Sequence, residues 1–83
     1  MFIVYAIYNH DHDKIYIGQT NNLELRLEAH RSKTFVTSYT SRFNGEWLLI
    51  YTEKIATLGE ALKREKQLKS FRGREFIRQF IKR

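Results

Sequence analysis

The stretch FIVYAIYNHDHDKIYIG, residues 2–18, decides the fold of this chain. Its first seven residues are mostly β-branched or aromatic and are apolar on both faces, which is typical of a buried strand. The polar residues Asn9 to Asp13 interrupt this pattern, and Lys14 to Gly18 resume it as a second strand. A polar segment of this length fits a hairpin, so the two strands are expected to pair antiparallel.

The residues after this hairpin predict a helix, a loop and a third strand. Asn21 or Asn22 can cap a helix that runs from Leu23 to about His30, because a short side-chain oxygen accepts hydrogen bonds from the first helical turn. Residues 32–45 show no clear period and are expected to form a long loop of the kind that often lines a functional site. Residues 47–51 are aromatic and aliphatic and predict the third strand.

The last third of the chain predicts two helices. Thr57 followed by Glu60 is a capping-box signature, and it starts a helix through about Phe71 that stops near Gly73. Apolar residues at helical spacing then predict a short C-terminal helix that packs back on the sheet; they are Phe76, Ile77, Phe80 and Ile81. The sequence therefore predicts an α+β fold of order β-β-α-β-α-α, with a three-stranded antiparallel sheet flanked by helices.

Length and composition limit the class of protein. With 83 residues, of which 42% are hydrophobic, the chain is expected to form a single domain over residues 1–83. No run of about 18 apolar residues is present, so no membrane association is expected. The N-terminus lacks the features of a secretory signal, which predicts a cytoplasmic protein. Because the chain has no cysteine, thiolate zinc sites, disulfides and cysteine nucleophiles are excluded.

The balance of charges favours a polyanionic partner. Fifteen Lys and Arg residues against nine Asp and Glu give a net charge of +6 and a pI near 9.8. Such a density is expected of a domain that binds nucleic acid, although small basic proteins without a specific partner also exist. Nothing in the sequence requires an obligate protein partner.

Glu65 interrupts the apolar side of the helix that begins after Thr57. The expected apolar stripe of this helix consists of Leu58, Ala61, Leu62 and Leu68. Glu65 falls on that stripe, and a carboxylate there must hold a metal ion, take a proton or pair with a cation. Lys69, one turn later, is the obvious partner for an ion pair. Glu60, in contrast, is explained as part of the capping box.

Arg26 presents the same problem on the first helix, where it shares an apolar edge with Leu23 and Leu27 and precedes His30 by one turn. The guanidinium fork matches two phosphate oxygens, which favours a phosphate contact. The alternative is an arginine whose stem simply covers the helix edge. The cluster His10 to Asp13 contains metal-ligating residue types, but its place at a hairpin tip argues against a metal site.

These residues together resemble the GIY-YIG nuclease superfamily. The resemblance rests on IVY at residues 3–5, YIGQTNNL at residues 16–23 with Arg26 and His30, and EALKREKQLK at residues 60–69. It spans nearly the whole chain and is similar in particular to small stand-alone bacterial members. The chain departs from the family pattern in two places: Ile3 replaces the glycine of the first signature, and no asparagine follows Asn44.

The resemblance implies a catalytic site and a cofactor. Glu65 would ligate a single Mg²⁺ or Mn²⁺, and Arg26 would donate to the scissile phosphate. His30 would bind the same phosphate or shuttle a proton. Tyr5 and Tyr16 are both candidates for the base that activates water, and the sequence does not decide between them.

Two functions follow from the resemblance. The first is a divalent-metal-dependent endonuclease that hydrolyses DNA, with repair or the processing of branched or damaged DNA as its expected setting. The second is a non-catalytic nucleic-acid-binding module that retains the nuclease fold. Further contacts to DNA are expected from Gly18, Lys33, Arg42 and Lys69, and Gly18 would leave room for a close approach of the DNA backbone. A protein-binding surface around Tyr39 and Phe43 is a third possibility.

Overall fold

A computed structural model describes residues 1–31 and 45–81, apart from the side chains of His30 and Arg31. The elements follow in the order β1 (Phe2–Asn9), β2 (Lys14–Thr20), α1 (Leu23–Arg31), β3 (Trp47–Ile55), α2 (Leu58–Lys69) and α3 (Phe71–Arg78). The α+β class and the predicted order of strands and helices are confirmed. The third strand is longer than the sequence predicted, because its pairing with β1 continues to Ile55.

The three strands form one antiparallel sheet in the order β2-β1-β3. The β1–β2 hairpin places Tyr5 opposite Gly18 and Ile7 opposite Tyr16. Its turn is closed by its own polar residues: the Asn9 side-chain oxygen accepts from the His12 N–H at 3.0 Å, and the Tyr8 hydroxyl donates to Asp13 at 2.6 Å. Asp13 adopts a left-handed conformation with φ 52°, which a short polar side chain tolerates in a turn. The predicted hairpin is confirmed.

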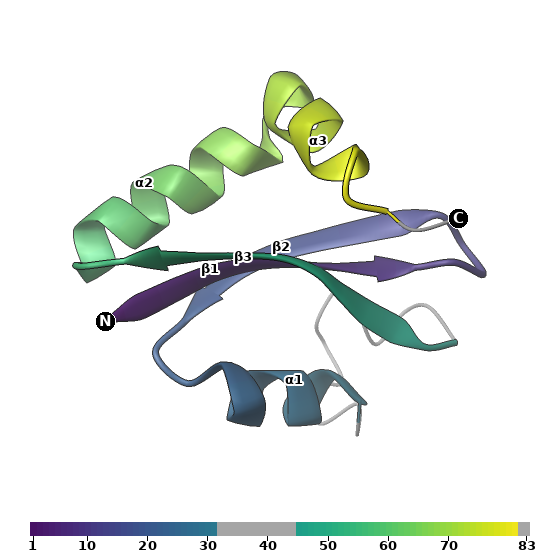
Figure 1. Ribbon diagram of the computed structural model, residues 1–83, viewed down its shortest axis with the longest axis horizontal. Helices are drawn as coiled ribbons and strands as arrows, with labels where there is room; N and C mark the ends of the chain where they lie inside the picture. The colour runs from purple at the N-terminus through teal and green to yellow at the C-terminus, as the bar shows by residue number, and fades with distance from the viewer. Residues whose placement is uncertain (32–44, 82–83) are drawn as a thin grey trace.

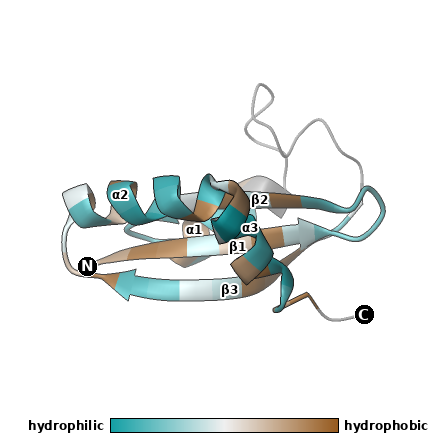
Figure 2. Ribbon diagram, turned by 90° about the horizontal axis from the view of Figure 1, so that it is seen from above, coloured by the Kyte–Doolittle hydropathy of each residue, from teal (hydrophilic) through white to brown (hydrophobic). Residues whose placement is uncertain are grey.

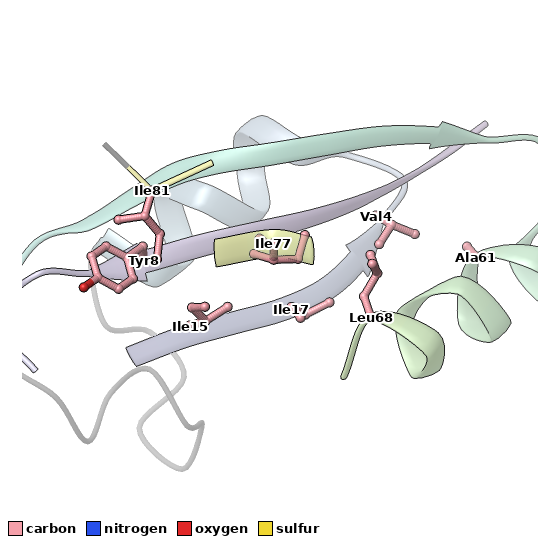
Figure 3. Packing of buried hydrophobic residues seen from close by; sticks show 9 residues of the cluster. Val4, Tyr8, Ile15, Ile17, Ala61, Leu68, Ile77 and Ile81 are labelled. Atoms are coloured by element: carbon pink, nitrogen blue, oxygen red, sulfur yellow. The ribbon is translucent and has the colours of Figure 1, made fainter. Parts of the chain in front are cut away.

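Helices cover both faces of the sheet, with α2 and α3 on one side and α1 on the other (Figure 1). The central strand β1 is therefore buried on both faces, which explains why its sequence is apolar without alternation. The core on the α2 and α3 side is shown in Figure 3 and consists of Val4, Ala6, Tyr8, Ile15, Ile17, Ala61, Leu68, Ile77 and Ile81. A smaller cluster on the α1 side contains Tyr5, Ile7 and Trp47.

The predicted role of Gly73 as the stop of the helix that begins after Thr57 was wrong. Helix α2 ends at Lys69, and Ser70 separates it from α3, so Gly73 lies inside α3 and is not a helix stop. The Ser70 hydroxyl caps α3 by accepting from the Gly73 N–H at 3.2 Å. A Cβ at position 73 would overlap the Gln67 carbonyl oxygen and the Leu68 Cα. Glycine is thus required at position 73 because α3 folds back tightly against the end of α2.

The predicted apolar stripe of α2 was also partly wrong. Ala61 and Leu68 are buried, but Leu58 and Leu62 are nearly half exposed. Figure 2 shows α2 as largely hydrophilic, whereas β1 carries long hydrophobic segments. The buried residues of α2 are Ala61 and Leu68. Arg64 and Glu65 of the same helix are half-buried.

No helix within residues 1–31 and 45–81 is long and apolar enough to cross a membrane.

Candidate active site

Two strand tyrosines form the centre of the candidate site. Tyr5 on β1 is fully buried, and Tyr16 on β2 is half-buried beside it. Their ring centroids lie 6.2 Å apart, with the ring planes inclined at 42°. Both side chains belong to the cluster on the α1 side of the sheet, where Leu23 and Leu27 of α1 pack. The hairpin register therefore brings the two tyrosines of the sequence signatures together.

Gly18 makes this arrangement possible. A Cβ at position 18 would lie 2.8 Å from the Tyr5 hydroxyl oxygen and 3.0 Å from Cε2 of Tyr16. The first contact is closer than a real Cβ tolerates and the second is very tight, so the two rings occupy the space that glycine leaves. The sequence predicted that this space would be open to the DNA backbone. In the structure it is filled by tyrosine, because Tyr5 is the cross-strand neighbour of Gly18.

Helix α1 carries Arg26 to the same side of the sheet. Asn22 starts the helix, since its Oδ1 accepts from the Leu25 N–H at 3.1 Å and its carbonyl accepts from the Arg26 N–H at 3.1 Å. The Thr20 hydroxyl in turn accepts from the Asn22 N–H at 3.1 Å, which fixes the helix to the end of β2. Arg26 is half-buried and lines a hollow of about 250 Å³ next to this cap.

Glu65 comes from α2, which lies over the other face of the sheet and contacts β2, the edge strand. Its carboxylate Oε2 accepts from the Lys69 Nζ at 2.8 Å. The side chain of Glu65 is 20% exposed and that of Lys69 is 47% exposed. The ion pair that the sequence offered as the structural explanation for Glu65 is therefore present, at the edge of the site.

Charged groups from α1 and α2 act on the pKa of Tyr5. Burial raises the pKa of the Tyr5 hydroxyl well above its ordinary value, and the neighbouring Tyr16 hydroxyl and the Glu65 carboxylate raise it further. The Arg26 guanidinium acts in the opposite direction and lowers the pKa. The rings of Tyr5 and Tyr16 are in contact, and the charges of Arg26 and Glu65 act on the Tyr5 hydroxyl.

A cleft of about 220 Å³ opens beside Tyr16, lined by Ile15, Ile17, Lys69 and Arg74. Arg74 is held there by α2, because its Nε donates to the Lys69 carbonyl at 3.1 Å. The sequence pattern alone did not single out Arg74. Its position depends on the break at Ser70, which the sequence pattern did not reveal.

Several predicted site residues fall outside the described part of the chain. Lys33 and Arg42 lie outside the described residues, as do Tyr39 and Phe43 of the proposed protein-binding surface. His30 lies in the last turn of α1, but its side chain is not among those described. The roles expected of these residues stay predictions.

The acidic and histidine residues of the described segments do not form a multidentate metal centre. Within residues 1–31 and 45–81, no three His, Asp or Glu side chains gather closely enough to share an ion. The hairpin residue Asp13 instead accepts from Tyr8 and lies 3.6 Å from an Arg78 nitrogen. Glu65 is the carboxylate that acts on Tyr5.

Known proteins show the same fold and domain type. The family model of the GIY-YIG catalytic domain matches residues 1–76. The fold is similar to the solution NMR structure of a UPF0213 protein from Bacillus halodurans, with a TM-score of 0.55 and 26% identity over 95% of this chain and 84% of that one. No curated protein sequence matches the chain. The family match covers both signature strands, α1 and the Glu65 helix, and the chain therefore belongs to the GIY-YIG nuclease superfamily.

Proposed function

We propose that the chain acts as a single domain over residues 1–83 and is a divalent-metal-dependent endonuclease that hydrolyses DNA phosphodiester bonds. The observation that carries this proposal is the contact between the Tyr5 and Tyr16 rings, with the Arg26 guanidinium and the Glu65 carboxylate both acting on the Tyr5 hydroxyl. Hydrolysis of a phosphodiester needs a positioned water, neutralisation of charge on the phosphorus and stabilisation of the departing oxygen. These side-chain types meet all three needs once a metal ion is bound.

The donor set at Glu65 fits a hydrated Mg²⁺ or Mn²⁺. Hard cations of this kind bind through one or two carboxylates and keep several waters, so a single half-buried glutamate is sufficient. The Lys69 ammonium beside Oε2 indicates that the carboxylate already favours a positive partner. When bound, one such ion supplies Lewis-acid stabilisation of the phosphate and of the leaving oxygen.

The two tyrosines are expected to have different roles. Tyr5 is fully buried against Tyr16 and is a neutral phenol at neutral pH, so it is expected to position the Tyr16 hydroxyl. Tyr16 is half-buried and borders the open cleft lined by Lys69 and Arg74, where a water molecule can reach its hydroxyl. We therefore assign the role of general base to Tyr16.

Arg26 would hold the scissile phosphate through its guanidinium fork, and His30 would bind the same phosphate or move a proton. Further contacts to the DNA backbone are proposed for Lys33, Arg42 and Lys69. Such contacts position the duplex without reading its sequence. The proposed setting is cytoplasmic, in repair or in the processing of branched or damaged DNA.

The proposal is tested by incubating the protein with Mg²⁺ or Mn²⁺ and a panel of supercoiled, nicked and branched DNA. Cleavage is expected for at least one substrate, and Glu65→Gln should reduce its rate by about 10² to 10³. Glu60→Gln is the matched control, because Glu60 lies exposed in the first turn of the same helix and should leave the rate unchanged.

Two outcomes would contradict the nuclease proposal. One is the absence of cleavage on every substrate together with tight, salt-sensitive binding, which is the behaviour of a non-catalytic nucleic-acid-binding module. The other is cleavage that Glu65→Gln leaves intact, since that would place the chemistry elsewhere.

A further inference from the structure

Lys69 lies between the Glu65 carboxylate and an open cleft. Its Nζ lies 2.8 Å from Glu65 Oε2, and the same residue lines the 220 Å³ cleft beside Tyr16 and Arg74. The two environments differ in chemistry. On one side is the carboxylate proposed to hold the metal. On the other is an open cleft that the positively charged Arg74 also lines.

The contact between Lys69 and Glu65 is weak enough to be exchanged. Ion pairs between residues four apart on a helix contribute little to stability when they are partly exposed, and the Lys69 side chain is 47% exposed. A divalent cation at Glu65 would repel the ammonium, because both would compete for the same carboxylate. The lysine stem has enough rotatable bonds to carry the charge away from Glu65 without moving α2.

The cleft offers a destination for the displaced ammonium. Arg74 is fixed at the cleft through its hydrogen bond to the Lys69 carbonyl, so a second positive group is already in place. Tyr16 borders the same cleft, which puts it next to the proposed reaction centre. A phosphate of the DNA backbone, adjacent to the one that is cut, has the charge and the oxygen acceptors to satisfy both cations.

We propose that Lys69 exchanges its partner during binding: it neutralises Glu65 in the metal-free protein, and after metal binding it joins Arg74 in holding a neighbouring DNA phosphate in the cleft beside Tyr16. The cleft would thus be a second phosphate site, coupled to the metal site through one lysine. This inference rests on the proposed function, because it requires a metal at Glu65 and DNA as the ligand.

The metal half of the exchange is tested with Mn²⁺ alone, by following free Mn²⁺ with electron paramagnetic resonance. Lys69→Met removes the competing ammonium and should tighten Mn²⁺ binding roughly two- to fivefold. Lys66→Met is the matched control, because Lys66 is an exposed lysine of the same helix and its removal should change the affinity much less. Glu65→Gln should abolish the binding.

The phosphate half is tested by the salt dependence of binding to a short DNA duplex in the presence of a chelator. With Glu65→Gln, Lys69 is released to the cleft, so adding Lys69→Met should reduce the slope of log affinity against log salt by about 0.9. In the parent protein Lys69 is held by Glu65, and Lys69→Met should change the slope clearly less. Lys66→Met should have the same effect in both backgrounds.

The outcomes separate this proposal from the proposed function. If the parent protein binds Mn²⁺ through Glu65 but Lys69→Met neither tightens that binding nor changes the slope in the Glu65→Gln background, the exchange alone is overturned. If the parent shows no Mn²⁺ binding that depends on Glu65, the metal role of Glu65 and the exchange both fail. Circular dichroism of each variant checks that it is folded.

Discussion

At the scale of single residues, the site depends on how Gly18 and Tyr5 fit against each other. The two are cross-strand partners, and the Tyr5 ring occupies the space where a side chain at position 18 would lie. The hydroxyl of Tyr5 is thereby held beside Tyr16. A glycine in an edge strand lowers strand propensity, so its presence here is explained by the position of the phenol and not by the strand.

Gly18→Ala is therefore expected to lower both activity and stability. The new Cβ forces Tyr5 or Tyr16 to shift, which should lower the cleavage rate at least about tenfold, since small displacements of reacting groups are costly. Overpacking of this kind should also reduce the free energy of unfolding by about 1–3 kcal/mol. Cleavage rates and urea denaturation of the same preparation measure both effects.

Gly59→Ala is the control for this substitution. Gly59 lies in the first turn of α2, and a Cβ at this position would meet no other group within 4 Å. Alanine should therefore stabilise the protein by about 0.5–1 kcal/mol and leave cleavage unchanged. Equal cleavage by the Gly18→Ala protein and the parent would show that the tyrosine positions do not depend on Gly18.

The buried phenol of Tyr5 also predicts a pH dependence of stability. Its pKa is raised in the folded protein, whereas in the unfolded chain it ionises near 10. Above that pH the unfolded state loses a proton that the folded state keeps, so the free energy of unfolding falls as pH rises. Below it, both states are protonated and the contribution is complete.

Tyr5→Phe should remove this contribution. Urea denaturation from about pH 8 to about pH 11 should show the parent losing stability more steeply than Tyr5→Phe once the pH exceeds the ordinary phenol value. Parallel stability curves for the two proteins across that range would mean that Tyr5 titrates normally in the folded state.

At the scale of the elements, the junction between α2 and α3 determines which basic residues reach the site. Ser70 ends α2 and caps α3, and the turn brings Arg74 back to the Lys69 carbonyl. The capping box at Thr57 was readable from sequence, and Glu60 N–H donates to the Thr57 hydroxyl at 3.2 Å. The break at Ser70 was not readable, because glycine is a common helix stop and Gly73 therefore suggested a later end. The actual role of Gly73 depends on its packing against Leu68.

Gly73→Ala is expected to separate these two helices. Its Cβ would meet backbone atoms of α2, which cannot move as a flexible side chain can, so the free energy of unfolding should fall by about 2 kcal/mol or more. Arg72→Ala, an exposed position on the same helix, should change it by less than about 0.5 kcal/mol. Thermal and urea denaturation measure the difference. A Gly73→Ala protein with the same free energy of unfolding as the parent would contradict the packing described.

At the scale of the whole molecule, the sequence predicted the strands, the helix order and the antiparallel sheet because each rests on local patterns: the hairpin at residues 9–13, the Asn22 cap and the apolar run of β1. The convergence of Glu65 with the tyrosines was not predictable from those patterns, since α2 and α1 lie on opposite faces of the sheet (Figure 1). Only the family resemblance linked them. The exposure of Leu58 and Leu62 was missed because helical spacing does not reveal how wide a helix contact is.

The central claim is that Tyr5, Tyr16 and Arg26 surround a metal ion held by Glu65, and paramagnetic broadening by Mn²⁺ tests it most directly. In nuclear magnetic resonance spectra, substoichiometric Mn²⁺ should broaden the ring signals of Tyr5 and Tyr16 and the side-chain signals of Arg26. In the Glu65→Gln protein this selective broadening should disappear. Broadening that persists without Glu65, or that is absent from both tyrosines in the parent, would contradict the account.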